Sequence, residues 1–326
     1  MRNILNVATK NGRFNILSAS THERYQSNMD NINADFYLYA DEGIKGWTDK
    51  YARLPSNHYI LPEKYIPFGV DFDFVLSQNR FGQFQKLAVI ANQLKIPLIT
   101  IEHTLPAPFW NAKFTQQVSE MRGLVDVYIS EYSAKKWTDK PYLVIPHCID
   151  NNKFQYSDQK RENVILSVAN DFINRDYCLN FTQYKNVTNG LPTLPIGDTP
   201  GFSKPAESID DLVKFYQNSR IFINTAHWSP IPMSLLEAMS CGCACVSINA
   251  CAIPEYIEHG VNGFLANNDQ EMREYLLVLL SNEELANELG SNAAKTIQEK
   301  CSKERFTSNW NNLLKGIYES QTIARK

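Results

Sequence analysis

The residues best suited to bind a substrate lie in one loop and in the helix that follows it. The run Arg220–Thr225 has an apolar centre with β-branched residues and predicts a buried strand, which ends in a proline-containing loop. Because proline is favoured in the first turn of a helix, we expect a helix to begin at Pro232 or Met233. The amides of Met233 and Ser234 would then lack partners within the helix. They would form an anion site suited to phosphate.

Glu237 lies one helical turn further along. A carboxylate there can accept hydrogen bonds from a ribose diol. It can equally cap the helix or pair with a basic side chain, and the residues alone leave both roles open.

The elements that position this loop follow a regular alternation. Short apolar runs predict strands, and stretches with helical spacing, such as Gln83–Leu94, separate them. In the first half of the chain the expected strands are Ile4–Ala8, Asp35–Ala40, Asp73–Ser77, Ile96–Glu102, Val125–Ser130 and Tyr142–Pro146. A further helix is expected over Phe114–Arg122.

A second series of the same kind follows a polar stretch without periodicity, His147–Glu162, which we interpret as a linker. Its expected strands are Val164–Val168, Thr193–Gly197, Arg220–Thr225 and Ala244–Ile248, and its expected helices are Tyr177–Lys185, Ser208–Asn218 and Ser234–Ser240, with three more starting near Asp269, Asn282 and Ser302. The pattern predicts an α/β protein of two Rossmann-like, doubly wound domains facing across a cleft. Ligands would bind at the carboxyl ends of the strands.

Length and composition agree with two globular domains. The chain has 326 residues, 44% hydrophobic and 21% charged, and a net charge of −3, which does not favour a dedicated polyanion binder. No run approaches 18 apolar residues, and the odd count of seven cysteines favours reduced thiols, so we expect a cytoplasmic protein. Cys241, Cys243 and Cys245 alternate at a helix-to-strand turn, where small buried residues fit, and we expect no metal.

Several motifs in order resemble a known family. The segment Ser234–Gly242 (SLLEAMSCG), followed by Ile253–Phe264 (IPEYIEHGVNGF), resembles the donor half of the family-4-type retaining glycosyltransferases, the glycosyl transferases group 1. Val144–Asp150 (VIPHCID) is similar to the family's linker strand, usually VIPNGVD. The first donor-domain strand and the terminal helical region are similar to Leu166–Ala169 and Leu285–Cys301.

This resemblance implies the GT-B fold and a domain assignment. Residues 1–150 would form an acceptor-side Rossmann-like domain and residues 151–305 the nucleotide-sugar donor domain. Residues 306–326 would form a C-terminal helix that crosses back to the first domain.

The resemblance also assigns roles at the donor site. In the family, the second glutamate of an E-x7-E motif contacts the nucleotide ribose, and this position is Glu237. The first glutamate contacts donor-sugar hydroxyls, and here it is Ser229. A serine can still hydrogen-bond, but one charged acceptor is lost, so donor preference or affinity must differ. Pro232, Met233 and Ser234 complete the donor-binding segment.

Two further family positions lie beside the donor diphosphate. The family's arginine and lysine correspond to Asn170 and Arg175, so one cation is lost and the other becomes a guanidinium. An arginine can bind phosphate bidentately. The alternative for Arg175 is a surface ion pair with Asp171 or Asp176.

His103, in the segment ITIEHT, corresponds to a family histidine that faces the donor sugar, and the adjacent Glu102 should point the opposite way. Gly12 and Arg13 are taken to follow the first strand, at the family's glycine-rich loop. Asp198 falls in the family's loop near the base. His227 contacts donor or acceptor, or covers the cleft. For Gly12, Arg13 and Asp198 an ordinary turn remains the alternative.

The resulting hypothesis is a glycosyltransferase that moves a sugar from a nucleotide-sugar donor to a surface glycan or another polymer. The family implies retention of configuration, with no metal and no cofactor other than the donor as co-substrate. One alternative is a glycosyltransferase acting on hydroxymethylated pyrimidines of DNA, which the near-neutral N-terminal half disfavours. A second is a non-catalytic GT-B-fold protein that binds a sugar or a partner, because Ser229 and Asn170 replace charged residues.

Overall fold

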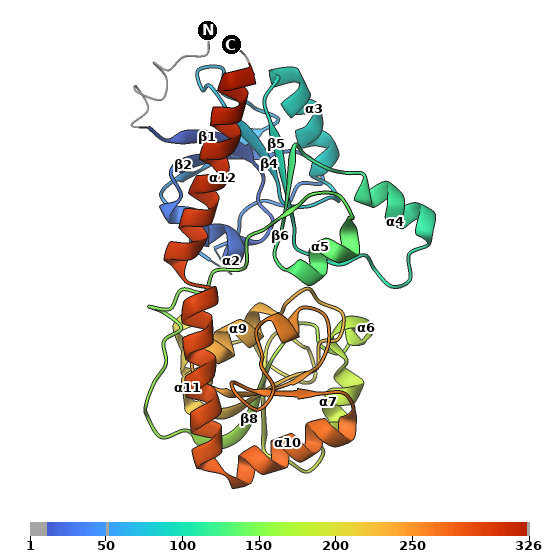
Figure 1. Ribbon diagram of the computed structural model, residues 1–326, viewed down its shortest axis with the longest axis vertical. Helices are drawn as coiled ribbons and strands as arrows, with labels where there is room; N and C mark the ends of the chain where they lie inside the picture. The colour runs from blue at the N-terminus through green and yellow to red at the C-terminus, as the bar shows by residue number, and fades with distance from the viewer. Residues whose placement is uncertain (1–11, 50–51, 325–326) are drawn as a thin grey trace. The chain divides into compact units, whose positions relative to one another are not determined.

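The computed structural model describes residues 12–49 and 52–324 as two α/β units, each built on a parallel sheet (Figure 1). Within the described chain, the first unit comprises residues 12–148 and 303–324, and the second comprises Ile149–Ser302. The expected strand Ile4–Ala8 lies outside the described residues. In the described ranges, no helix combines the length and the apolar character that a membrane span requires.

The first unit has a seven-stranded sheet in the order β3-β2-β1-β4-β5-β6-β7 with every described pairing parallel. Its strands are β1 (Phe14–Ser18), β2 (Ala34–Ala40), β3 (His58–Glu63), β4 (Phe74–Ser77), β5 (Leu98–Glu102), β6 (Val125–Tyr128) and β7 (Leu143–Val144). The chain builds outward from β1 through β2 to β3, and then returns to β4 on the other side of β1. The strand order therefore reverses between β1 and β4, which is the topological switch point where doubly wound sheets bind ligands.

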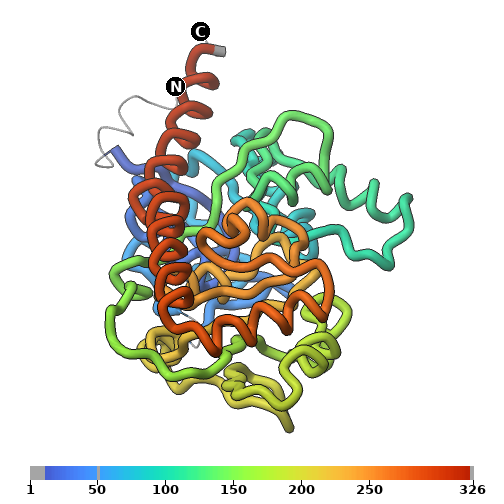
Figure 2. Tube along the Cα trace, turned by 60° about the horizontal axis from the view of Figure 1, so that its bottom comes forward, coloured from blue at the N-terminus to red at the C-terminus, as the bar shows by residue number. Residues whose placement is uncertain are grey.

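Helices cover this sheet. They are α2 (Glu23–Gln26), the 3-10 helix η1 (Ser27–Asn31), α3 (Phe84–Leu94), α4 (Ala112–Ser119), α5 (Glu131–Trp137) and α12 (Lys303–Ala324). A core between β1, β4, β5 and α3 includes Leu17, Val75 and Leu87, each with no exposed surface. Figures 1 and 2 show α12 running beside the strands of this unit, where Tyr318 packs on Phe14 at 5.4 Å.

The second unit has a five-stranded parallel sheet in the order β12-β11-β10-β8-β9. Its strands are β8 (Glu162–Val168), β9 (Thr193–Ile196), β10 (Ser219–Asn224), β11 (Ala244–Ile248) and β12 (Phe264–Ala266), and its helices are α6 (Asp176–Leu179), α7 (Phe181–Thr188), α8 (Ile209–Asn218), α9 (Met233–Ser240), η2 (Ile253–Glu255), α10 (Asp269–Ser281) and α11 (Glu283–Lys300). Here the strand order reverses between β8 and β10. The loops after these two strands therefore flank the switch point of the second sheet.

Several elements differ from the sequence expectations, among them the strands β3 and β12, which no expected strand covers. The helix expected over Tyr177–Lys185 is two helices, α6 and α7, because Asn180 adopts a left-handed conformation (φ 57°) that ends the first and begins the second. The strand β1, which follows Arg13, is absent from the expected elements. By contrast, the helices expected near Asp269 and Asn282 begin within one residue of those positions, and asparagine side chains cap both.

Candidate functional site

Most of the residues assigned to the donor site follow the strands of the second unit. Asn170 comes after β8, Asp198 after β9, and His227 and Ser229 after β10, just before α9. Because all these strands are parallel, their carboxyl ends meet at one edge of the sheet. The structure thus brings these four residues to a common edge of the second unit.

The loops after β8 and β9 are fastened together. The Asn170 side-chain oxygen accepts a hydrogen bond from the Asp198 amide (2.8 Å), so this asparagine holds the neighbouring loop in place. Gly197 has a φ of 135°, and a Cβ there would lie 1.9 Å from the carbonyl oxygen of Ala169. Only glycine fits this close approach.

Arg175 presents an exposed guanidinium at the start of α6. The two carboxylates considered as partners are otherwise engaged: Asp171 accepts from the Asn174 side chain (2.6 Å), and Asp176 accepts from the Thr182 amide (2.8 Å). Among the described residues, Arg175 forms no side-chain ion pair. It is therefore a cation that an anionic ligand can bind bidentately.

The loop after β10 is hydrogen-bonded to α6. The amides of His227 and Trp228 donate to the carbonyl of Cys178 (3.0 and 3.2 Å), and the Thr225 hydroxyl donates to Leu179 (2.8 Å). The loop that carries His227 is therefore anchored to the short helix that begins after Arg175. The Nδ1 atom of His227 is buried and has no hydrogen-bond partner among the described residues.

The N-terminus of α9 has the geometry of an anion site. Pro232 is the N-cap and provides no side-chain cap, and its carbonyl accepts from the amides of Leu235 and Leu236 (3.2 and 3.4 Å). The amides of Met233 and Ser234 precede these first helical bonds, and both residues are half-buried. Unpaired amides at the positive end of a helix favour a bound anion.

Glu237 differs from the sequence expectation. Its side chain has no exposed surface, and one carboxylate oxygen accepts a hydrogen bond from the hydroxyl of Tyr216 on α8 (3.0 Å). Tyr216 is equally inaccessible. In this geometry the carboxylate is enclosed within the second unit, with one of its oxygens bonded to Tyr216.

In the first unit, His103 follows β5, at the carboxyl end of the sheet. Its ring lies against the ring of Tyr25 (4.6 Å between centroids) and near that of His147 (6.3 Å). Burial lowers the pKa of His103 well below its ordinary value and lowers the pKa of His147 to about 3. Both imidazoles are neutral near pH 7. Glu102 points elsewhere, as expected, and pairs with buried Arg80 (2.5 Å).

The strand that Gly12 and Arg13 are expected to follow, Ile4–Ala8, lies outside the described residues. Gly12 and Arg13 directly precede β1, and Arg13 pairs with Asp35 (3.0 Å) and donates to the Ala34 carbonyl (2.5 Å) at the start of β2. These contacts lie at the amino ends of the strands, at the opposite edge of the sheet from His103. The residues that do follow β1 include His22 and Tyr25, which the sequence analysis missed because it did not identify Phe14–Ser18 as a strand.

The cysteines of the second unit are buried thiols. Burial raises the pKa of Cys243 to about 11, and the pKa values of Cys241 and Cys245 are also raised. Within the ranges that the structure describes, no three His, Cys, Asp or Glu side chains are grouped so as to hold a metal ion.

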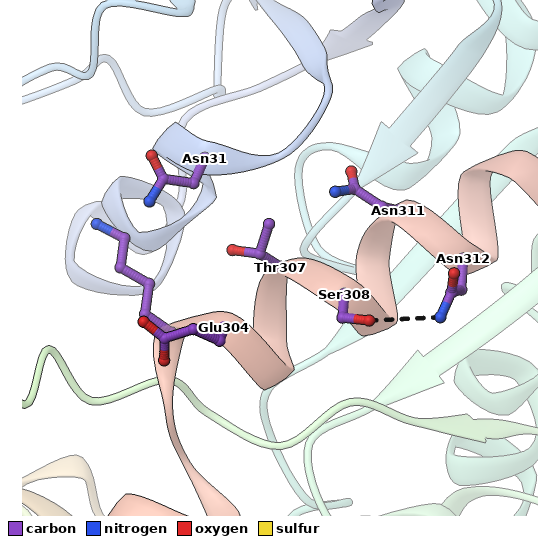
Figure 3. A pocket seen from close by; sticks show the side chains of 7 residues that line it. Asn31, Glu304, Thr307, Ser308, Asn311 and Asn312 are labelled. Carbon is purple, nitrogen blue, oxygen red and sulfur yellow. Dashed lines mark hydrogen bonds between the residues drawn. The ribbon is translucent and has the colours of Figure 1, made fainter.

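A separate polar hollow of about 400 Å³ lies in the first unit between η1 and α12 (Figure 3). Its lining includes Lys303, which pairs with Asp30 (2.8 Å), and the adjacent turns of α12, where Asn312 donates to Ser308 (3.5 Å). None of the predicted site residues lines it. Among the described residues, the hydroxyl of Thr307 in this lining is buried without a hydrogen-bond partner.

Comparison with known proteins shows a family match and a fold. The model of the glycosyl transferases group 1 matches residues 202–296. An uncharacterized glycosyltransferase of Haemophilus influenzae is 28% identical over 133 residues, which is 40% of this chain and 36% of that protein. The chain spans only about a quarter to a third of the length of the first curated relatives that it matches.

Two solved structures cover nearly the whole chain. The sucrose-phosphate synthase of Thermosynechococcus elongatus matches with a TM-score of 0.77 at 10% identity, covering 94% of this chain and all of that one. Anabaena HepE (Alr3699), in complex with UDP, matches with a TM-score of 0.72 at 14% identity, covering 93% of this chain and all of that one. These likenesses show a fold of two Rossmann-like domains.

Proposed function

We propose that this chain, which belongs through its second unit to the glycosyl transferases group 1 and has the GT-B fold, transfers a sugar from a nucleotide-sugar donor to a glycan or other polymer. The observation that carries this proposal is the carboxyl edge of the second sheet. There the guanidinium of Arg175 and the amides of Met233 and Ser234, none of which has a partner in the part of the chain that the structure describes, lie near segments that are bonded to α6. These are groups that bind a diphosphate.

In this proposal the donor diphosphate binds at the N-terminus of α9 and beside Arg175. Negative charge develops on the diphosphate as the bond to the sugar breaks, and fixed amides and a guanidinium stabilise such charge. These groups supply the positive charge that a metal ion would otherwise provide, so we propose a metal-independent reaction without a further cofactor. The UDP complex of Anabaena HepE supports UDP as the nucleotide to test first.

The remaining assignments rest on the family resemblance. His103 faces the donor sugar, and the configuration at the anomeric carbon is retained. Ser229 supplies a neutral hydrogen bond where the family has a glutamate. Because Glu237 is buried against Tyr216, we assign the nucleotide contacts to the loops that carry Asn170 and Asp198, and not to this carboxylate.

The test is calorimetric titration of the full chain with UDP, together with an assay of slow UDP-glucose and UDP-N-acetylglucosamine hydrolysis. We expect UDP binding that Arg175→Ala weakens about 10–100-fold, since a hydrogen bond to a charged group contributes about 1.5–3 kcal/mol. The exposed Arg305→Ala serves as the charge-matched control and should leave affinity unchanged. Failure of UDP, ADP and GDP to bind at millimolar concentration would contradict a nucleotide-sugar donor and favour the non-catalytic alternative.

A further inference from the structure

We propose that His22 is a second substrate-contacting residue, which together with His103 binds the hydroxyls of an uncharged sugar at the switch point of the first sheet. In the reaction proposed above, on which this inference rests, that sugar is the acceptor. No motif in the sequence indicates His22, and its position becomes apparent only from the sheet topology.

The two loops that flank the switch point are joined by hydrogen bonds. The loop after β1 leads to His22, and the loop after β4 ends at Gln83. The Gln83 amide donates to the carbonyl of Ser20 (2.9 Å) and to the hydroxyl of Thr21. Gln83 is 3% exposed, so this bridge is shielded from water. It fixes the backbone immediately before His22 against the neighbouring loop.

The two imidazoles face each other across this point. The ring centroids of His22 and His103 are 4.4 Å apart, at an interplanar angle of 59°. Tyr25, which is 1% exposed, supports His103 from the interior, whereas His22 is exposed to solvent. His22 begins α2 but its side chain makes no capping hydrogen bond. An exposed imidazole thus lies against a half-buried one, and no hydrogen bond from residues 12–49 or 52–324 accounts for its position.

Polar groups in this region lack partners. The Nε2 atom of His103 is buried without a hydrogen-bond partner, and so are both amide atoms of Gln78, the residue directly after β4. Gln78 is 1% exposed. A buried polar group without a hydrogen-bond partner destabilises the folded state by about 1–3 kcal/mol. Native proteins usually satisfy such groups with water or a ligand. Gln78 directly follows β4 and His103 directly follows β5, so both lie at the carboxyl edge of the first sheet, where the His103 ring contacts His22.

The chemistry of these groups selects a neutral ligand. A neutral imidazole has one donor and one acceptor, and a hydroxyl matches both. Burial lowers the pKa of His103, and the protein atoms around the outward-facing His22 ring displace enough water to lower its pKa as well, which keeps both rings uncharged near pH 7. The adjacent charges are already neutralised, because Glu23 pairs with Lys45 (2.9 Å) and Glu102 with Arg80. A sugar hydroxyl therefore fits better than a phosphate or a carboxylate.

The position relative to His103 identifies the sugar. If His103 faces the donor sugar, a residue whose ring is 4.4 Å away contacts the molecule that reacts with it. Transfer requires the attacking hydroxyl to lie within about 3–3.5 Å of the anomeric carbon. His22 is accordingly assigned to the acceptor, and the acceptor site is assigned to uncharged sugars.

The experiment uses saturation-transfer NMR on the full chain with saturating UDP. The probes are methyl α-glucoside and methyl α-N-acetylglucosaminide, with glucose 6-phosphate as the charged comparison. We expect the neutral glycosides to bind, their signal to fall at least fivefold in His22→Ala, and part of it to return in His22→Asn, which keeps a neutral donor and acceptor. His259→Ala, which removes another exposed histidine but in the second unit, should keep the full signal.

Three results would overturn the inference: no glycoside binds the wild-type chain, His22→Ala binds as well as wild type, or glucose 6-phosphate binds better than the glycosides. Circular dichroism of each variant confirms folding. UDP titration of the same samples separates the two proposals. UDP binding without glycoside binding removes the inference and leaves the proposed function, whereas glycoside binding without UDP binding removes the nucleotide-dependent reaction and retains the hydroxyl site.

Discussion

The contact between Glu237 and Tyr216 decides which of two roles the glutamate plays. Both side chains have no exposed surface, and the tyrosine hydroxyl donates to the carboxylate at 3.0 Å. We predict that Tyr216→Phe destabilises the second unit by about 1.5–3 kcal/mol, because it removes a hydrogen bond to a buried acidic side chain and fills no new volume. UDP affinity should change less than threefold.

The magnitude can be read as a shift in melting temperature. For a unit the size of Ile149–Ser302, about 1 kcal/mol shifts the melting temperature by roughly 2–4 °C. A loss of about 2 kcal/mol therefore lowers it by roughly 4–8 °C, which differential scanning calorimetry measures easily. The matched control is Tyr177→Phe, which removes the hydroxyl of a tyrosine that is 56% exposed and should change stability by less than about 0.5 kcal/mol.

The opposite role makes the opposite prediction. If Glu237 contacted the ribose, Tyr216→Phe would leave the melting temperature unchanged, and Glu237→Gln would weaken UDP binding more than tenfold in a fully stable protein. That pair of results would refute the buried geometry and restore the family role. Destabilisation by both substitutions with nearly unchanged UDP affinity supports the interior contact.

Three further predictions concern other residues. Arg175→Glu should abolish measurable UDP binding. The variant should melt at the same temperature as wild type, because the exposed guanidinium has no ion-pair partner among the described residues. If the Arg175→Glu variant still bound UDP, Arg175 would be excluded from the anion site. Gly197→Ala should destabilise the second unit by more than about 2 kcal/mol, because the added Cβ would lie 1.9 Å from the Ala169 carbonyl oxygen. An unchanged midpoint of urea unfolding would contradict the close approach of these two loops. The free energy of unfolding should fall as the pH drops below about 6.5, because burial lowers the pKa of His147 to about 3 and the unfolded chain then binds more protons than the folded one. The slope of this free energy against pH is about 1.4 kcal/mol per pH unit for each such histidine. His147→Asn should reduce the slope in melting curves recorded from pH 7 to 5.

The fold could be predicted where local chemistry determines it. The helices of the second unit begin where Ser208, Asn268 and Asn282 cap them, and each cap is a hydrogen bond to an amide three residues on. The fully buried strand β10 was visible from its apolar centre, Ile221–Ile223. Such features depend on neighbours in the sequence, so the sequence alone is sufficient to identify them.

The first unit was less predictable because its strands depend on distant partners. The edge strand β3 alternates weakly and contains Pro62, and β1 has only five residues. Missing β1 moved the expected substrate loop to Gly12, at the wrong edge of the sheet. The His22–His103 contact joins residues 81 positions apart, and no local pattern indicates it.

The spacing of residues within a motif predicts where a side chain lies on its helix but not which way the side chain points. The position of Glu237 on α9 was predicted, but the direction of its carboxylate depends on Tyr216, which lies on another helix. With Glu237 turned inward, Ser229 neutral, and Asn170 bound to the Asp198 loop, Arg175 is the cation that remains at the family's donor-site positions. Donor affinity in the proposed reaction then depends mainly on one guanidinium and two helix amides. Sugar recognition depends correspondingly more on the neutral imidazoles of the first unit, so substitutions at Arg175 and His22 should affect separate substrates.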